Sequence, residues 1–236
     1  MTWMDRLSLF TPLDLCAVAL IYATWLLAGW RIENPGSKRP SVSILMAEYR
    51  REWMRQMVTR QPRIFDSQTL ATLRESTSFF ASATMIAIGG VLAAIANGER
   101  LMGLANQITL ESDPAIVWEI KMLVVLTFLI NAFLKFVWSN RLFGYCGVLM
   151  AAVPNDPKDP AALPRAAKAA TINITAARSF NRGLRSIYFA MGAAAWLLGA
   201  GALIAASLLV FAVLWRREFT SQSRAALLDP SDRTSV

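Results

Sequence analysis

Apolar residues along the chain gather in four long blocks separated by polar segments. A helix needs roughly 20 apolar residues to cross a bilayer core of about 30 Å. Four blocks approach or exceed this length, at residues 12–30, 79–96, 118–138 and 187–215. The pattern predicts an all-α polytopic membrane protein with a bundle of four transmembrane helices, in one membrane domain over residues 1–219.

The polar segments differ in charge, which predicts an orientation. Lys and Arg are concentrated in the first and third loops, whereas the second loop has Arg100 against Glu99, Glu111 and Asp113. Because basic residues stay on the cytoplasmic side, we expect the first and third loops to be cytoplasmic in a bacterial inner membrane. With four spans, both termini are then predicted to be periplasmic. The basic residues are Arg31, Lys38, Arg39, Arg50, Arg51, Arg55, Arg60, Arg63 and Arg74 in the first loop, and Arg141, Lys158, Arg165, Lys168, Arg178, Arg182 and Arg185 in the third.

The first block and the segment after it carry local signals. Thr11 and Asp14 suit the cap and first turn of a helix that starts at Pro12, and the absence of a small-residue cleavage site predicts that this helix is uncleaved. Residues 41–61 have apolar positions at helical spacing opposite Glu and Arg, which predicts an amphipathic helix. Such a helix either lies in the headgroup region or docks on the protein or a partner.

The second and fourth blocks carry small residues on one face. Asp66 looks like the N-cap of a helix that continues to Asn97. Faces of Ala and Gly let helix backbones approach closely in lipid, so we expect these two helices to meet tightly. The two faces are Ala83, Ala87, Gly90 and Ala94, and Gly192, Ala195, Gly199, Ala202 and Ala206.

The third block has no helix breaker at its cytoplasmic end. The first strong breaker is Pro154, so the helix is predicted to extend well past Trp138. Asp156-Pro157 and Asp159-Pro160 are helix-start signals, and the helix after them is expected to run into the fourth block. Residues 220–236 are predicted to be a disordered tail.

Three stretches of the sequence are distinctive together. They are 79–84 with Gly89-Gly90, 133–139 with Arg141 and Tyr145-Cys146, and 179–185 with Tyr188-Phe189. These stretches resemble the membrane-protein family catalogued as domain of unknown function 599, over residues 31–215. The resemblance implies a multi-spanning bacterial membrane protein, and it implies no activity.

The residue types available limit the chemistry. The chain has no histidine, which removes the commonest general base and metal ligand. Cys16 and Cys146 lie in different blocks, so we expect neither a disulfide nor a thiolate metal site. Asp156 and Asp159 are explained as helix caps, and no serine has a base nearby in the sequence. The sequence therefore predicts a protein that is not an enzyme and has no cofactor.

Five residues at the cytoplasmic ends of the third and fourth blocks form a candidate binding site. Arginine clusters suit phosphate groups, and an anionic headgroup or ligand is the expected occupant. Two simpler interpretations stay open: the Lys135 side chain extends to the interface, and the arginines form a solvated face. The five residues are Lys135, Arg141, Asn181, Arg182 and Arg185.

Two functional hypotheses follow. The first is a non-enzymatic accessory, assembly or self-associating membrane subunit, favoured by the two small-residue faces. The alternative is a transporter or lipid-handling protein with a basic cytoplasmic vestibule. The net charge of +8 is explained by anionic lipids at the membrane surface, and no nucleic-acid partner is expected.

Overall fold

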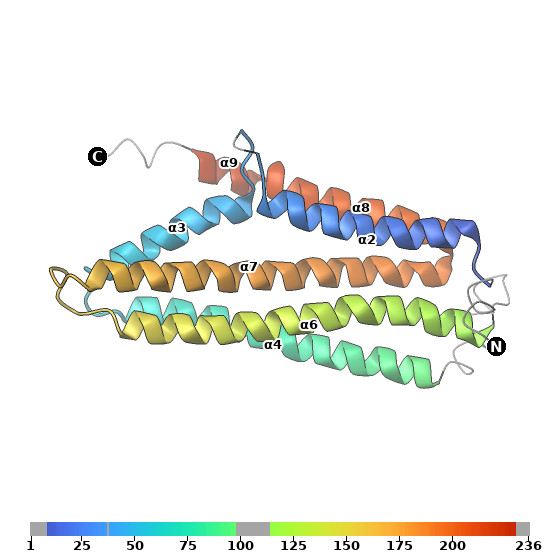
Figure 1. The fold of residues 1–236 in the computed structure, drawn as a ribbon, viewed down its shortest axis with the longest axis horizontal. Helices are drawn as coiled ribbons and strands as arrows, with labels where there is room; N and C mark the ends of the chain where they lie inside the picture. The colour runs from blue at the N-terminus through green and yellow to red at the C-terminus, as the bar shows by residue number, and fades with distance from the viewer. Residues whose placement is uncertain (1–8, 37, 98–113, 230–236) are drawn as a thin grey trace. The chain divides into compact units, whose positions relative to one another are not determined.

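The computed structural model describes residues 9–36, 38–97 and 114–229. Within these ranges all regular structure is helical and no β-strand occurs (Figure 1). The all-α prediction is confirmed. In chain order the helices are α2 (Pro12–Glu33), α3 (Val42–Met57), α4 (Ile64–Ala96), α6 (Ala115–Ala151), α7 (Ala162–Ala194), the 3₁₀ helix η1 (Ala195–Leu198), α8 (Ala200–Phe219) and α9 (Gln222–Leu228).

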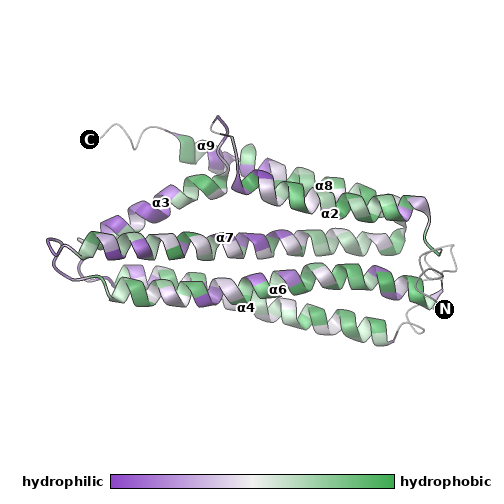
Figure 2. Cartoon of the chain, in the orientation of Figure 1, coloured by the Kyte–Doolittle hydropathy of each residue, from purple (hydrophilic) through white to green (hydrophobic). Residues whose placement is uncertain are grey.

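Four helices are long and apolar enough to cross a membrane, namely α2, α4, α6 and the helix that begins at Ala200. In Figure 2, α8 is drawn mostly in hydrophobic colours, whereas α3 mixes hydrophobic and hydrophilic residues. The first three predicted blocks each lie inside one of these helices, and α6 continues past Trp138 to Ala151 as expected. The chain is therefore a polytopic membrane protein.

The fourth predicted span, a single helix over 187–215, is wrong. α7 ends at Ala194, and η1 leads to Gly199, whose φ of 110° and ψ of 168° place it in a backbone region used almost only by glycine. The chain reverses there into α8 (Figure 1). A Cβ added at Gly192 would lie 3.4 Å from Val210, so the end of α7 and α8 pack as an antiparallel hairpin.

The chain divides into two compact units, and α2, α4, α6, α7 and α8 contribute to both. Each unit has its own buried core. Unit 1 consists of Met1–Gly29, Ser82–Phe133 and Leu184–Leu214, and unit 2 of Trp30–Ala81, Leu134–Gly183 and Trp215–Val236.

The core of unit 1 is aromatic. Phe128 of α6 stacks on Tyr22 of α2 at 5.1 Å between ring centroids, and Trp25 meets Phe128 edge-on at 5.4 Å. Phe189 of α7 stacks on the same ring at 6.1 Å. Since Phe128 is 1% exposed, it is the central side chain on which three helices converge.

The start of α2 is fixed within unit 1 by Asp14. Its carboxylate accepts hydrogen bonds from the backbone N–H and hydroxyl of Thr11, while the Thr11 hydroxyl accepts from the backbone N–H of Asp14. This reciprocal pair confirms the predicted cap. The other Asp14 oxygen accepts from Trp196 Nε1 in η1 at 2.7 Å. Because α2 and α8 both start beside η1, they run in the same direction through unit 1.

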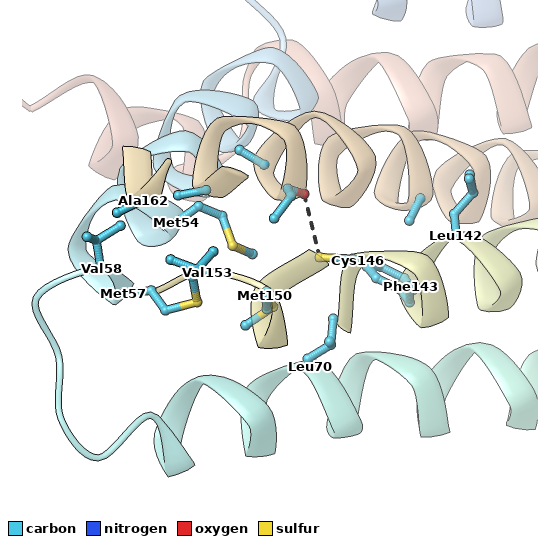
Figure 3. Close-up of a cluster of buried hydrophobic side chains, with 14 residues drawn as sticks. Met54, Met57, Val58, Leu70, Leu142, Phe143, Cys146, Met150, Val153 and Ala162 are labelled. Atoms are coloured by element: carbon cyan, nitrogen blue, oxygen red, sulfur yellow. Dashed lines mark hydrogen bonds between the residues drawn. The ribbon is translucent and has the colours of Figure 1, made fainter. Parts of the chain in front are cut away.

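The amphipathic helix is present as α3 and belongs to unit 2. Ser41 is its N-cap and accepts from the backbone N–H of Ile44, and the helix ends at Met57 rather than at residue 61. Met54 and Met57 are fully buried in the core of unit 2, against Met150 and other side chains (Figure 3). Of the two alternatives for this helix, docking on the protein itself is the one that these contacts support.

The predicted disordered tail is wrong over Gln222–Leu228, which form α9. Ser221 caps this helix by accepting from the backbone N–H of Arg224, and Arg224 Nε donates to the carbonyl of Pro40 at 2.9 Å. These contacts within unit 2 are remote in sequence, which explains why a polar terminal segment is helical. Residues 230–236 lie outside the described ranges.

The predicted tight packing between the two small-residue faces is also wrong. A Cβ added at Gly90 would have no neighbour within 4 Å. Gly192 instead faces Val210 and Ala206 of α8 and Ile21 of α2. The small residues after α7 serve the hairpin with α8, because the chain turns at Gly199.

Candidate functional site

The most deeply buried carboxylate among the described residues of unit 2 is Asp66. α4 begins at Ile64, so Asp66 lies in its first turn and is not the predicted N-cap. Asp66 is 0% exposed. Its Oδ1 accepts from Trp53 Nε1 at 2.7 Å and from the guanidinium of Arg60, whereas its buried Oδ2 has no hydrogen-bond partner among the described residues.

Arg63 stands just before α4 and ties it to the end of α6. Its terminal nitrogens donate to the carbonyls of Val153 and Pro154, both at 2.7 Å, and to that of Val58 at 3.3 Å. Val153 and Pro154 directly follow the C-terminus of α6, which ends at Ala151, and a cation near a helix C-terminus is favoured by the helix dipole. The buried Nε–H of Arg63 has no hydrogen-bond partner within the part of the chain that the structure describes.

A cavity of about 380 Å³ lies between α4 and the end of α6, entirely within unit 2. Asp66 and Arg63 line it from one side, and Arg74 stands exposed at its rim. Much of the remaining wall is apolar, so the cavity combines a few charged groups with a hydrophobic floor. The lining residues are Met57, Arg63, Asp66, Ser67, Leu70, Ala71, Arg74, Gly147, Met150, Ala151 and Asn155.

A second buried polar chain links α3, α7 and α6. The guanidinium of Arg50 donates to the side-chain oxygen of Asn173. Asn173 Nδ2 lies 3.5 Å from Cys146 Sγ, which lies 3.5 Å from the carbonyl of Ala169. Burial lowers the pKa of the Arg50 guanidinium, and the hydrogen bond to Asn173 gives that buried charge a polar partner. This series of contacts links α3, α6 and α7.

The five predicted binding residues have separate surroundings. Arg141 lies over the ring of Tyr145 and donates to its hydroxyl. Asn181 Nδ2 lies 3.4 Å from the hydroxyl of Ser43. Arg182 forms an ion pair with Glu33. Lys135 is half-buried and contacts no other charged group that the structure describes. Arg185 belongs to unit 1 and is 6% exposed. Their joint role stays a prediction, and none of them lines the cavity.

With this geometry established, the chain can be compared with known proteins. Residues 16–223 match a family model described as Protein of unknown function, DUF599. The chain belongs to this family. The match confirms the resemblance seen in the sequence and extends from α2 to α9. Neither the curated proteins nor the solved structures give a match.

The sequence did not single out the cavity. Asp66 was explained as a cap, and Arg63 and Arg74 were counted only as basic loop residues. One signal was available, because Asp66 is an isolated acid that follows Arg60 and Arg63 within two helical turns. An acid among arginines is a good candidate for a buried pair, but Trp53 and Val153 can be found as partners only in the folded protein. No cluster of three metal-ligating side chains occurs among residues that the structure describes.

Proposed function

We propose that this protein is a non-enzymatic subunit of a bacterial inner membrane that acts by associating with another membrane helix. The observation that carries the proposal is the exposure of α4. Only 6% of its most apolar stretch is buried, against 39% for α6 and 22% for α2. A membrane helix that contributes so little to its own bundle has most of its surface free for another helix.

The exposed face of α4 has the composition that such contacts need. Ala83, Ala87 and Gly90 are all exposed in unit 1, and a Cβ added at Gly90 would meet nothing. Helix association in lipid depends on close packing rather than on the hydrophobic effect, and small residues permit the closest approach. The face therefore suits a second helix, and a second copy of α4 is the simplest occupant.

The proposed orientation keeps the basic loops in the cytoplasm and moves the C-terminal segment there. Since α8 runs parallel to α2 through unit 1, both helices leave unit 1 at the same end. Arg31 lies in the last turn of α2, just after its unit 1 part, and Arg216 and Arg217 follow the unit 1 part of α8. All three basic residues then agree with the positive-inside rule, whereas a single fourth span put the last two outside.

Cysteine cross-linking in native membranes tests the association. In a Cys16→Ser background, Ala87→Cys should form a cross-linked product on oxidation, and adding Gly90→Leu should suppress it because a bulky side chain blocks close approach. Leu209→Cys is the matched control, since Leu209 is also an exposed residue of unit 1 but lies on α8. Absence of a product from Ala87→Cys, or equal products from both positions, would contradict the proposal.

A second candidate function, binding of an anionic group by the predicted basic residues, is favoured by one observation. Lys135 is half-buried without a charged partner among the described residues, so an anionic headgroup would supply one. Retention of anionic lipid should then fall in Lys135→Met and stay unchanged in Arg178→Gln, as measured by native mass spectrometry. Equal retention in both variants would leave association as the better proposal.

A further inference from the structure

We propose that α6 presents a binding surface for an α-helix of another protein, one that has an apolar face and a carboxylate opposite Arg141. The surface, which we call the α6 stripe, lies on the unit 2 part of α6. It belongs to a different helix and a different unit from the α4 face proposed for association, so this inference stands independently of the proposed function. The α6 stripe consists of Leu134, Val137, Trp138, Arg141, Tyr145 and Val148, all of them exposed.

The residues of the α6 stripe share one side of the helix, because they recur mainly at intervals of three and four residues. The opposite side of α6 carries Phe143, Cys146 and Met150, which lie in the core of unit 2 (Figure 3). Leu134 is 58% exposed and Val148 is 70% exposed. The stripe is therefore open at both of its ends.

Lipid does not account for the far end of the α6 stripe, because α4 is polar at the same level. Asn140 Nδ2 donates to Ser78 Oγ at 2.9 Å. A Cβ added at Gly147 would lie 3.2 Å from Leu70. Val148 is therefore level with the part of α4 around Leu70. The exposed side chains of α4 there include Gln68, Thr72, Arg74 and Glu75.

α7, on the other side of α6, is also polar at this level. Ser139 Oγ donates to the carbonyl of Ala176 at 2.8 Å, and Cys146 Sγ lies 3.5 Å from the carbonyl of Ala169. The exposed side chains of α7 around these contacts include Lys168, Thr171, Thr175 and Arg178. An exposed apolar patch bordered by polar residues is typical of a protein-binding surface.

The spacing along the α6 stripe favours a helix as the occupant. Residues 134, 137, 141, 144 and 148 follow the alternating intervals of three and four that form the seam of a coiled coil. Position 144 is a glycine, and a Cβ added there would have no neighbour within 4 Å. A second helix can therefore approach α6 closely at this point.

The composition of the α6 stripe is that of a binding hot spot. Tryptophan, tyrosine and arginine are the residue types most enriched in hot spots, and Trp138, Tyr145 and Arg141 supply one of each. The guanidinium of Arg141 lies over the ring of Tyr145, and its Nε donates to the Tyr145 hydroxyl. This contact holds a positive charge within the stripe.

Arg141 decides between a second copy of the chain and another protein. No ion pair of Arg141 occurs in the described part of the chain. Copies of a membrane protein share one orientation, so two α6 stripes would meet in parallel and place Arg141 opposite Arg141. Like charges that face each other disfavour an interface, whereas a carboxylate of a different protein can pair with the guanidinium.

Photo-cross-linking of the full-length protein in native membranes tests the partner. The photoreactive amino acid p-benzoylphenylalanine replaces Val148 or, as the control, Thr72, which is exposed at a similar level on α4. We expect a cross-link to another protein from position 148 and none from position 72. Mass spectrometry of the cross-linked peptide should show apolar residues at intervals of three and four, with Asp or Glu about two helical turns from the attached residue.

Reversal of one charge tests the carboxylate. Arg141→Glu should lower the yield of the cross-link from position 148 by about tenfold or more. Arg74→Glu is the matched control, since it makes the same change at an exposed arginine of α4, and it should leave the yield unchanged. Replacing the identified partner carboxylate by arginine should restore the yield in Arg141→Glu. Melting of both variants should stay near that of the wild type, because both positions are exposed.

Each outcome decides the proposal. A cross-link to another protein from position 148 alone, lost in Arg141→Glu and restored by the reversed charge on the partner, supports it. A product with a second copy of the chain, a product with lipid, or no product from position 148 would overturn it. Equal yields from positions 148 and 72, a yield that Arg141→Glu leaves unchanged, or no restoration by the partner's arginine would also overturn it.

Discussion

Units 1 and 2 contain parts of the same helices but hold them together in different ways. In unit 1 the helices converge on aromatic rings around Phe128, with a few polar contacts such as that from Ser186 to Asn131. In unit 2 the contacts between helices include Arg50 with Asn173 and Trp53 with Asp66. Unit 2 also has ring contacts, among Phe80, Phe136 and Phe180. The difference is that unit 2 adds hydrogen bonds between helices that involve a buried arginine and a buried carboxylate.

We propose that unit 1 lies in lipid and unit 2 in water, and that the difference between their contacts follows from these two solvents. Lipid provides no hydrophobic driving force between helices, so a membrane bundle depends on van der Waals packing. In water, apolar burial drives association without selecting one arrangement, and satisfied buried polar networks add specificity.

The largest effect is expected from emptying each core. Phe143 in unit 2 is 2% exposed and Phe128 in unit 1 is 1% exposed, so the two substitutions by alanine are closely matched. Phe143→Ala should cost about 3–5 kcal/mol, the usual range for a buried phenylalanine in water. Phe128→Ala should cost less, because detergent or lipid solvates the apolar surface that unfolding of unit 1 exposes. Unfolding in mild detergent gives both values, and a larger loss for Phe128→Ala would contradict the assignment of solvents.

Two glycine substitutions are expected to change stability less, and in opposite directions. A Cβ at Gly183 would lie 2.6 Å from the ring of Phe136, which is fully buried. Gly183→Ala should therefore destabilise the protein by about 1–3 kcal/mol through overpacking, despite the better helix propensity of alanine. Gly90→Ala meets nothing and should leave the monomer at least as stable. Equal melting of both variants would show that the Gly183 contact is not tight.

The turn at Gly199 should respond through its backbone. Its φ of 110° is strained for any other residue, although an added Cβ would have no neighbour. Gly199→Ala is expected to cost on the order of 1–3 kcal/mol, whereas Gly201→Ala, inside α8 and with equal space, should be neutral or stabilising. Thermal melting of the two variants compares a substitution that strains the backbone with one that does not. Unchanged melting of Gly199→Ala would mean that α7 and α8 do not need this turn.

The smallest effect is expected from the ion pair between Arg182 and Glu33. The Arg182 side chain is 43% exposed, and exposed pairs contribute about 0.2–1 kcal/mol. Arg182→Gln and Glu33→Gln should each lower the melting temperature slightly, and the double variant should lose little more than either one. A loss well beyond this range would indicate that the pair is part of a larger network.

The sequence predicted elements that depend on local signals. Thr11 with Asp14 placed the start of α2, and the absence of breakers before Pro154 predicted the length of α6. It did not predict the break after Ala194, because alanine favours helix on both sides and Trp196 is held by Asp14, 182 residues away in sequence. It also missed the cavity, since Asp66 and Arg63 acquire their partners only when α3, α4 and the end of α6 come together.

We propose that unit 1 is the membrane-embedded part and that the hairpin at Gly199 returns the chain to the cytoplasmic side. Labelling of single cysteines with an impermeant thiol reagent tests it in a Cys16→Ser background, with Asn97→Cys, Ser67→Cys and Ser223→Cys. We expect Asn97→Cys to react in intact cells, whereas Ser67→Cys and Ser223→Cys should react only after permeabilisation. Reaction of Ser223→Cys in intact cells, with Ser67→Cys still protected, would contradict the return of the chain through α8.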